Sequence, residues 1–258
     1  MIRKINLYLI SAVSILLIFV SESHAADKLG SAEKYNRAGA LYREGNFVEA
    51  LRMYEELIHQ GIVNPDLFYN ASNAAYRSGS TGKAMLYLER SIKLAPSDHD
   101  ALDNLRYLNS IKKDSEPSNS NRVLAFLSRR YHNINVNHAA VWSAVSFALA
   151  MFAAIGALFS INWKRFAFGG VSIFIGVIFL ISTGVFIQKV HHDITVVEAI
   201  IMSEEANAYS GPGVENTHIF TIHEGTKVII ERSQNSWNLI RLKSGAGGWI
   251  KSDRMERI

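Results

Sequence analysis

The sequence predicts a multidomain protein in which an all-α repeat domain, a two-helix transmembrane hairpin and a small all-β barrel follow one another. Three observations support this fold class. Residues 28–113 contain a 34-residue repeat pattern, residues 139–161 and 166–187 carry no charged side chain, and from residue 195 short apolar runs alternate with turns. The first pattern is typical of paired helices, the second of membrane spans and the third of short strands.

The N-terminal residues have the three-part layout of a secretory signal peptide. Two cations, beginning at Arg3, precede an apolar run over 7–20, and small residues stand at Ser23 and Ala25. This spacing predicts that residues 1–25 are a signal peptide cleaved after Ala25, with an uncleaved anchor as the alternative. In either case the domain that follows is carried across the membrane.

The two uncharged runs predict transmembrane helices over 139–161 and 166–187. At about 1.5 Å of rise per residue, each is long enough to cross a hydrocarbon core of about 30 Å. The turn between them holds only four residues, which forces an antiparallel hairpin with both outer ends on one side. Alanines spaced four apart, Ala150 with Ala154 and Ala153 with Ala157, favour close helix contact. Residues 114–138 are expected to be a linker and juxtamembrane segment.

The leader and the hairpin together predict an orientation. If the leader exports the first domain, the Lys164-Arg165 turn is cytoplasmic, and both soluble domains lie on the periplasmic side of the cytoplasmic (inner) membrane. The charges around the hairpin alone favour the opposite orientation, since four cations flank its outer side against two in the turn. We give the leader more weight because the first hydrophobic segment usually dominates. The outer cations are Arg122, Arg129, Arg130 and Lys189.

The net charge of +4 is not concentrated in either soluble domain. Residues 27–116 hold 12 Lys and Arg against 13 Asp and Glu, and residues 195–258 hold 7 against 8. A nucleic-acid-binding domain gathers its cations on a folded surface, so we expect no nucleic-acid partner. The chain also has no cysteine, which excludes disulfides, thiolate metal sites and a cysteine nucleophile.

The 34-residue shift superimposes residues 35–62 on 69–96. It aligns Gly45 with Gly79, where two helices turn tightly, and Ala50 with Ala84, where they cross closely. A period of this length is typical of helix–turn–helix repeats, and over about 28–111 of the expected repeat domain 28–113 the residues resemble the tetratricopeptide repeat family. Residues 98–113 resemble the first helix of a third repeat, which can cap the stack.

By analogy with that family, the first helix of each repeat lines a peptide-binding groove. Aromatic side chains would supply contact area and asparagines would bond the peptide backbone. An alternative is that several of the tyrosines pack helix against helix. The expected groove residues are Tyr35, Asn36, Tyr42, Tyr69, Asn70, Asn73, Tyr76 and Arg77.

From residue 195 the sequence predicts five short strands, over 196–202, 219–222, 227–231, 237–242 and 248–251, which suggest a small closed barrel. Four stretches in order resemble the bacterial SH3-like (SH3b) family across 195–258. They are Tyr209-Ser210-Gly211-Pro212, Gly225-Thr226-Lys227-Val228, Trp237-Asn238-Leu239-Ile240 and Gly248-Trp249-Ile250.

Three aromatic residues of this domain are candidates for different roles. Trp249 is expected in the core, because Gly248 lets its ring lie against the barrel. Tyr209 and Trp237 are the better ligand-binding candidates, although a barrel this small also needs aromatics for packing. The sequence has Ala208-Tyr209 where the family usually has Val-Arg, which affects the ligand surface.

The sequence offers no arrangement typical of catalysis or cofactor binding. It contains no Gly-x-Ser-x-Gly, His-Glu-x-x-His or phosphate-binding loop. His191 and His192 are adjacent, so in an extended chain their rings point to opposite faces and one metal ion cannot easily take both. We therefore expect a protein that is not an enzyme and holds no cofactor or metal.

The order of leader, repeats, two-span hairpin and SH3b domain resembles the BatE family of bacterial aerotolerance (Bat) proteins. That resemblance implies partners among membrane proteins, including von Willebrand A-domain proteins encoded alongside a MoxR-type ATPase. It favours a non-enzymatic, membrane-anchored envelope scaffold that binds proteins through the repeat groove and the SH3b domain, in a Bat-type stress or aerotolerance complex. The alternative is a cell-wall sensor or accessory protein whose SH3b domain binds peptidoglycan.

Overall fold

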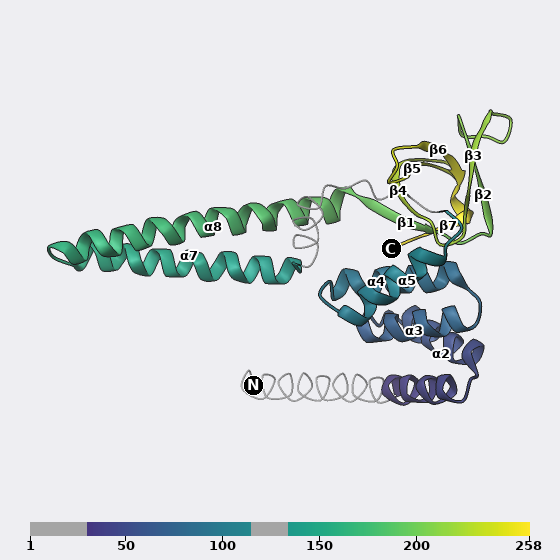
Figure 1. Cartoon of the computed structure of the whole chain (residues 1–258), viewed down its shortest axis with the longest axis horizontal. Helices are drawn as coiled ribbons and strands as arrows, with labels where there is room; N and C mark the ends of the chain where they lie inside the picture. Colours follow the sequence, from purple (N-terminus) through teal and green to yellow (C-terminus); the bar gives the residue numbers. More distant parts are fainter. Residues whose placement is uncertain (1–29, 115–133) are drawn as a thin grey trace, which may run out of the picture. The chain divides into compact units, whose positions relative to one another are not determined.

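The computed structural model describes residues 30–114 and 134–258 (Figure 1). The expected signal peptide, and all of the expected linker except its two ends, lie outside these residues. The chain divides into two compact units, Met1–Ser80 and Thr81–Ile258. The division falls inside the segment 28–113 that the sequence assigns to one repeat domain. The last two helices of that segment therefore belong to the same unit as the hairpin and the strands.

Within the described residues, the first unit contains helical residues 30–43, α2 (Phe47–His59) and α3 (Pro65–Arg77). The first connection closes at Gly45, whose φ of 86° is the left-handed conformation that glycine adopts without strain. Helix α3 begins at a proline, with Asn64 as its N-cap accepting a bond from the Leu67 amide at 3.0 Å. The buried residues of α2 are Ala50, Leu51, Tyr54 and Leu57.

The second unit begins with α4 (Thr81–Leu94) and α5 (His99–Ile111). The starts of these two helices follow the starts of α2 and α3 with the same 34-residue spacing that the sequence shows. The turn glycines share this spacing and nearly the same φ, 86° at Gly45 and 87° at Gly79. Both aligned alanines, Ala50 and Ala84, have no exposed surface, as expected where helices cross closely.

Two antiparallel helices, α7 (Val136–Phe159) and α8 (Trp163–Thr195), form the long hairpin of the second unit (Figure 1). They are long and apolar enough to span a membrane, and most of their side chains are exposed. Helix α8 runs eight residues beyond the end expected from the uncharged run.

The contact between α7 and α8 follows a seven-residue spacing that was not predicted from the sequence. Ala139, Ser146 and Ala153 are the buried residues of α7, whereas Ala150, Ala154 and Ala157 are only half-buried. Small residues every seventh position are typical of helices that wind gently around each other. The Ser143 and Thr183 hydroxyls add a 2.7 Å hydrogen bond between the two helices.

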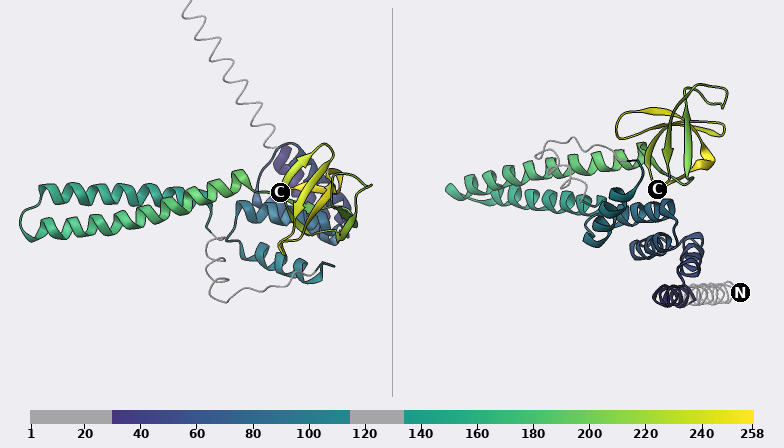
Figure 2. Two further views of the ribbon diagram at one scale, coloured as in Figure 1. Left: turned by 90° about the horizontal axis from the view of Figure 1, so that it is seen from above. Right: turned by 45° about the vertical axis from the view of Figure 1, so that its right-hand side comes forward.

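The strands form one antiparallel sheet in the order β3-β2-β6-β5-β4-β1-β7. Figure 2 shows this sheet from two further directions. Their bounds are β1 (Val197–Ile201), β2 (Glu205–Tyr209), β3 (His218–His223), β4 (Lys227–Gln234), β5 (Trp237–Arg241), β6 (Gly247–Lys251) and β7 (Met255–Arg257). Two of them, β2 and β7, were not predicted from the sequence. Strand β2 is Glu-Ala-Asn-Ala-Tyr, which is poor in β-forming residues, and β7 has only three residues.

Inward-facing aliphatic side chains from six of these strands make one core. Its buried residues are Ala199, Ile201, Ala206, Ala208, Ile222, Val228, Ile230, Ile240 and Ile250. Alanine stands at both inward positions of β2, which gives the core room for the isoleucines of the facing strands. These side chains share one face of the sheet and form its apolar core.

Candidate functional site

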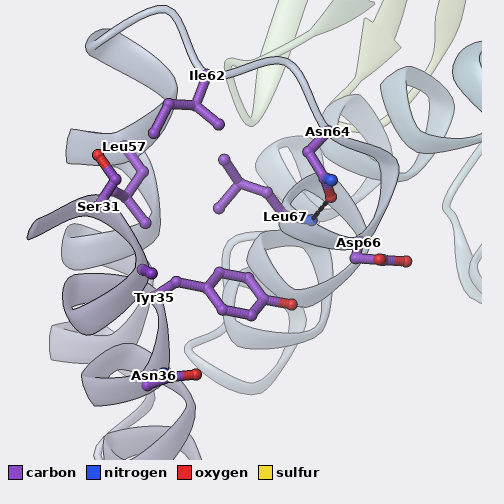
Figure 3. Close-up of a pocket in the computed structure, with 9 residues that line it drawn as sticks. Ser31, Tyr35, Asn36, Leu57, Ile62, Asn64, Asp66 and Leu67 are labelled. Carbon is purple, nitrogen blue, oxygen red and sulfur yellow. Dashed lines mark hydrogen bonds between the residues drawn. The ribbon is translucent and has the colours of Figure 1, made fainter. Parts of the chain in front are cut away.

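The first unit contains a pocket of about 280 Å³ that opens between its helices (Figure 3). The helix over 30–43 supplies Ser31, Ala32, Tyr35 and Asn36, and the end of α2 supplies Leu57. The connection after α2 and the first turn of α3 supply Ile62, Asn64, Asp66 and Leu67. Asn64 caps α3 and Pro65 begins it, so the first turn of the helix supplies Asp66 and Leu67 to the lining.

The pocket combines an apolar floor with a polar rim. Leu57 and Leu67 are almost fully buried and Ile62 is half-buried, so the floor accepts an aliphatic side chain. Asn36 and Asp66 are exposed on the rim, where their oxygens can accept hydrogen bonds from a ligand. A small apolar cavity with few polar groups at its edge is the usual form of a recognition site.

Tyr35 lies between the floor and the rim, and its ring points across the pocket (Figure 3). Its hydroxyl oxygen accepts a bond from the Asn70 amide at 2.6 Å, and its ring packs edge-on against Tyr54 at 5.8 Å. Burial raises the pKa of Tyr35, partly offset by the Asn70 bond, and the nearby Asp66 carboxylate raises it further. The hydroxyl therefore stays protonated and retains its own proton to donate to a ligand.

The structure separates the eight expected groove residues into different environments. Tyr35 and Asn36 line the pocket, while Asn70 lies behind it as the hydrogen-bond partner of Tyr35. Tyr42 and Arg77 both pack on Phe47, with ring centroids 5.2 Å apart for Tyr42 and the Arg77 guanidinium 4.4 Å from the ring centre. The other three, Tyr69, Asn73 and Tyr76, are half-buried residues of α3 that do not line the pocket.

Most of the pocket residues were not anticipated from the sequence. The repeat alignment pointed to the first helices of the repeats, whereas the pocket also takes residues from the end of α2, the connection after it and the first turn of α3. A signal for it is present at Asn64-Pro65-Asp66, because an asparagine cap, a proline and a first-turn acid mark a helix start. Aliphatic side chains beside such a start indicate where a pocket floor can form.

The sheet has its own cavity, of about 390 Å³, which brings together the other two expected binding residues, Tyr209 and Trp237. Their rings lie 5.7 Å apart and nearly perpendicular. Trp237 is only 9% exposed, so it offers little more than an edge to a ligand, while Tyr209 is half-buried. Exposed polar side chains complete the rim: Glu205, Asn207, Lys251 and Arg254. Trp249, expected in the core, is also 9% exposed.

Polar side chains also gather outside the two cavities. Within residues 30–114 and 134–258, no three His, Asp or Glu side chains gather in a way that could hold a metal ion. Asp114, His223 and Thr226 lie together, but the Thr226 hydroxyl donates to the Asp114 carboxylate at 2.8 Å. Since that hydroxyl is bonded to a carboxylate rather than to the imidazole, the cluster does not have the geometry of an activated nucleophile.

Comparison with known proteins does not assign the chain to a family. No family model matches it, and no curated protein matches it significantly. The function is therefore inferred from the two cavities and from the apolar hairpin.

Proposed function

We propose that this protein is a non-enzymatic scaffold of the bacterial envelope, anchored in the inner membrane by α7 and α8, which binds protein partners through its helical region. In this proposal the helical region is tetratricopeptide-like and the sheet is SH3-like. The 34-residue spacing of helices and turn glycines supports the first assignment. The exposed apolar side chains of α7 and α8 support the anchor, since water would not solvate them.

The single observation that carries the binding function is the pocket around Tyr35. Its floor fits an aliphatic side chain, the Tyr35 hydroxyl can donate to a peptide carbonyl, and Asn36 can accept from a peptide N–H. These groups match an extended peptide segment, and the Asp66 carboxylate favours a neutral or cationic one. By the Bat resemblance, the peptide would belong to a membrane protein, such as one with a von Willebrand A domain.

The experiment is co-purification from membranes of the full-length protein carrying N36A and D66A. Both side chains are exposed, so the fold should tolerate their removal, and loss of two rim bonds should weaken partner capture about tenfold. A matched control replaces Asn104 and Asp100, which occupy the equivalent positions two repeats after Asn36 and one repeat after Asp66. Equal capture by the parent, the N36A/D66A variant and the control would exclude this pocket as the binding site.

A second candidate function is a cell-wall sensor or accessory protein whose sheet binds peptidoglycan. The observation that favours it is the cavity lined by Tyr209 and Trp237, because perpendicular aromatic rings with polar neighbours can hold a sugar or a short peptide. A sedimentation assay with purified cell-wall sacculi distinguishes the two functions. Retention that Y209A abolishes and N36A/D66A leaves intact would support the sensor.

A further inference from the structure

Within the second unit, polar contacts join the sheet to α4 and to the segment that follows α5. The densest of them centres on Asp114, three residues past the end of α5. One carboxylate oxygen accepts from the His223 amide at 2.6 Å and from the Thr226 hydroxyl at 2.8 Å. The other oxygen lies 2.7 Å from the His223 ring nitrogen Nδ1. Partial burial acts to raise the pKa of Asp114, but these bonds outweigh it and the pKa is lowered.

The turn between β3 and β4 also supplies a cap for α4. The Gly82 amide donates to Glu224 Oε1 at 2.6 Å, and amides in the first turn of a helix have no acceptor within the helix. The Glu224 carboxylate there also meets the positive end of the helix dipole. A side chain at position 82 would not fit, since its Cβ would stand 2.8 Å from Glu224 Cγ and 3.1 Å from the Ile201 carbonyl oxygen.

Two cation contacts extend the joined surface along α4. Lys227 Nζ lies 3.0 Å from Glu89 of α4 and 2.9 Å from Glu198 of β1. Near the end of α4, Arg90 bonds Glu256 Oε1 at 3.0 Å and the Arg257 carbonyl oxygen at 2.6 Å, both in β7. The contacts thus involve the end of β3, the β3–β4 turn, β1, β4 and β7.

From these contacts we infer that the sheet is an intramolecular docking module, whose ligand is α4 and the segment that follows α5 in the same chain. Each contact pairs a charged group of one element with a donor or acceptor of the other, as in a specific protein–protein interface. The β3–β4 turn is therefore occupied by the chain itself, and external ligands of the sheet are restricted to other surfaces. The inference does not rest on the proposed peptide site, which lies in the other unit.

Amide hydrogen exchange of the full-length protein in detergent micelles tests this inference, with the Gly82 amide as the probe. The Gly82 amide donates to Glu224 of the β3–β4 turn, so the exchange rate of this amide reports how often the sheet separates from α4. The D114A substitution removes the acceptor for three donors, and R90A removes the contact with β7. If docking is cooperative, each variant should speed Gly82 exchange, by about tenfold for D114A and about fivefold for R90A.

Matched controls are D103A and R106A, which remove the same residue types from an exposed ion pair on α5 and should leave Gly82 exchange unchanged. The D114N variant keeps one acceptor oxygen and should fall between the parent and D114A. Circular dichroism confirms that each variant is folded. Unchanged Gly82 exchange in R90A would overturn the inference, because the contacts would then open independently; unchanged exchange in D114A would do the same.

Discussion

At the scale of single residues, Lys227 shows how a charge can be retained in a mostly buried position. About a third of its side chain is exposed, and its ammonium group lies between Glu89 and Glu198. Burial acts to lower the pKa of Lys227, but the two carboxylates outweigh it and the pKa is raised. Removing this cation would leave two carboxylates facing each other across the contact between α4 and β1.

We therefore expect K227M to lower the free energy of unfolding by about 1–3 kcal/mol, less than for a fully buried pair because water still reaches the site. Because the folded pKa of Lys227 lies above its usual value of 10.5, the stabilisation is fully present below pH 10.5 and is lost as the pH rises through the folded pKa. Thermal melting in detergent, measured from neutral to alkaline pH, should show a difference between parent and variant that shrinks only above pH 10.5.

The control for this prediction is K243M, which replaces an exposed lysine in the turn after β5. It should melt like the parent protein at every pH. If K227M also melts like the parent, the two carboxylates do not need their cation and the electrostatic interpretation is wrong.

The candidate site illustrates how much residue patterns can predict. The repeat alignment found Tyr35 and Asn36, which line the pocket, but it placed Asn70 beside them as an equivalent groove residue. In the structure Asn70 instead bonds the Tyr35 hydroxyl, because helices at equivalent repeat positions are neighbours. Whether a tyrosine lines a groove or packs against the next helix depends on that neighbour, which a one-dimensional pattern does not contain.

At the scale of elements, prediction depended on the strength of the local pattern. The two uncharged runs located α7 and α8, but α8 continues to Thr195 because its last turns are polar and a hydropathy pattern ends before them. Five strands followed from runs of β-branched and aromatic residues. Strand β2 was missed because alanines fill its inward positions, where the core needs small side chains rather than good strand formers.

The helix crossing at Ala50 provides a test at this scale. Ala50 is completely buried on α2, so a tryptophan there has no room, and overpacking of this kind typically costs about 1–3 kcal/mol. The A50W protein should therefore melt earlier than the parent when the full-length chain is heated in detergent. The matched control is V48W on the same helix, where the native side chain is 71% exposed and a larger one can extend into water.

A melting curve for A50W that coincides with that of V48W would show that α2 tolerates bulk at this position. The 34-residue alignment would then have misplaced the close crossing. The equivalent variant A84W tests the same interpretation in α4, where the alanine is also completely buried.

At the scale of the whole molecule, the contacts between the sheet and the α4–α5 region could not be predicted from the sequence. Asp114 is 109 residues from His223, and Gly82 is 142 residues from Glu224. Single polar residues at such separations form no periodic pattern, and each resembles an ordinary surface residue until the partner is placed beside it. The repeats and the barrel were therefore expected to be separate modules, whereas α4 and α5 share a compact unit with the sheet.

The orientation of the hairpin is the last property that belongs to this scale. If α7 and α8 both cross the membrane, as we propose, the chain returns to the side from which it entered, and the segments before α7 and after α8 share that side. The signal-peptide pattern predicts that this side is the periplasm, while the cations around the hairpin favour the cytoplasm.

Alkaline phosphatase, which is active only after export, distinguishes these two orientations. Fusions at Asp114 and at Ile258 should be active, and a fusion at Trp163, between the two helices, should be inactive. Activity at Trp163 alone would reverse the orientation and place both binding regions in the cytoplasm, where a cell-wall ligand could not reach them.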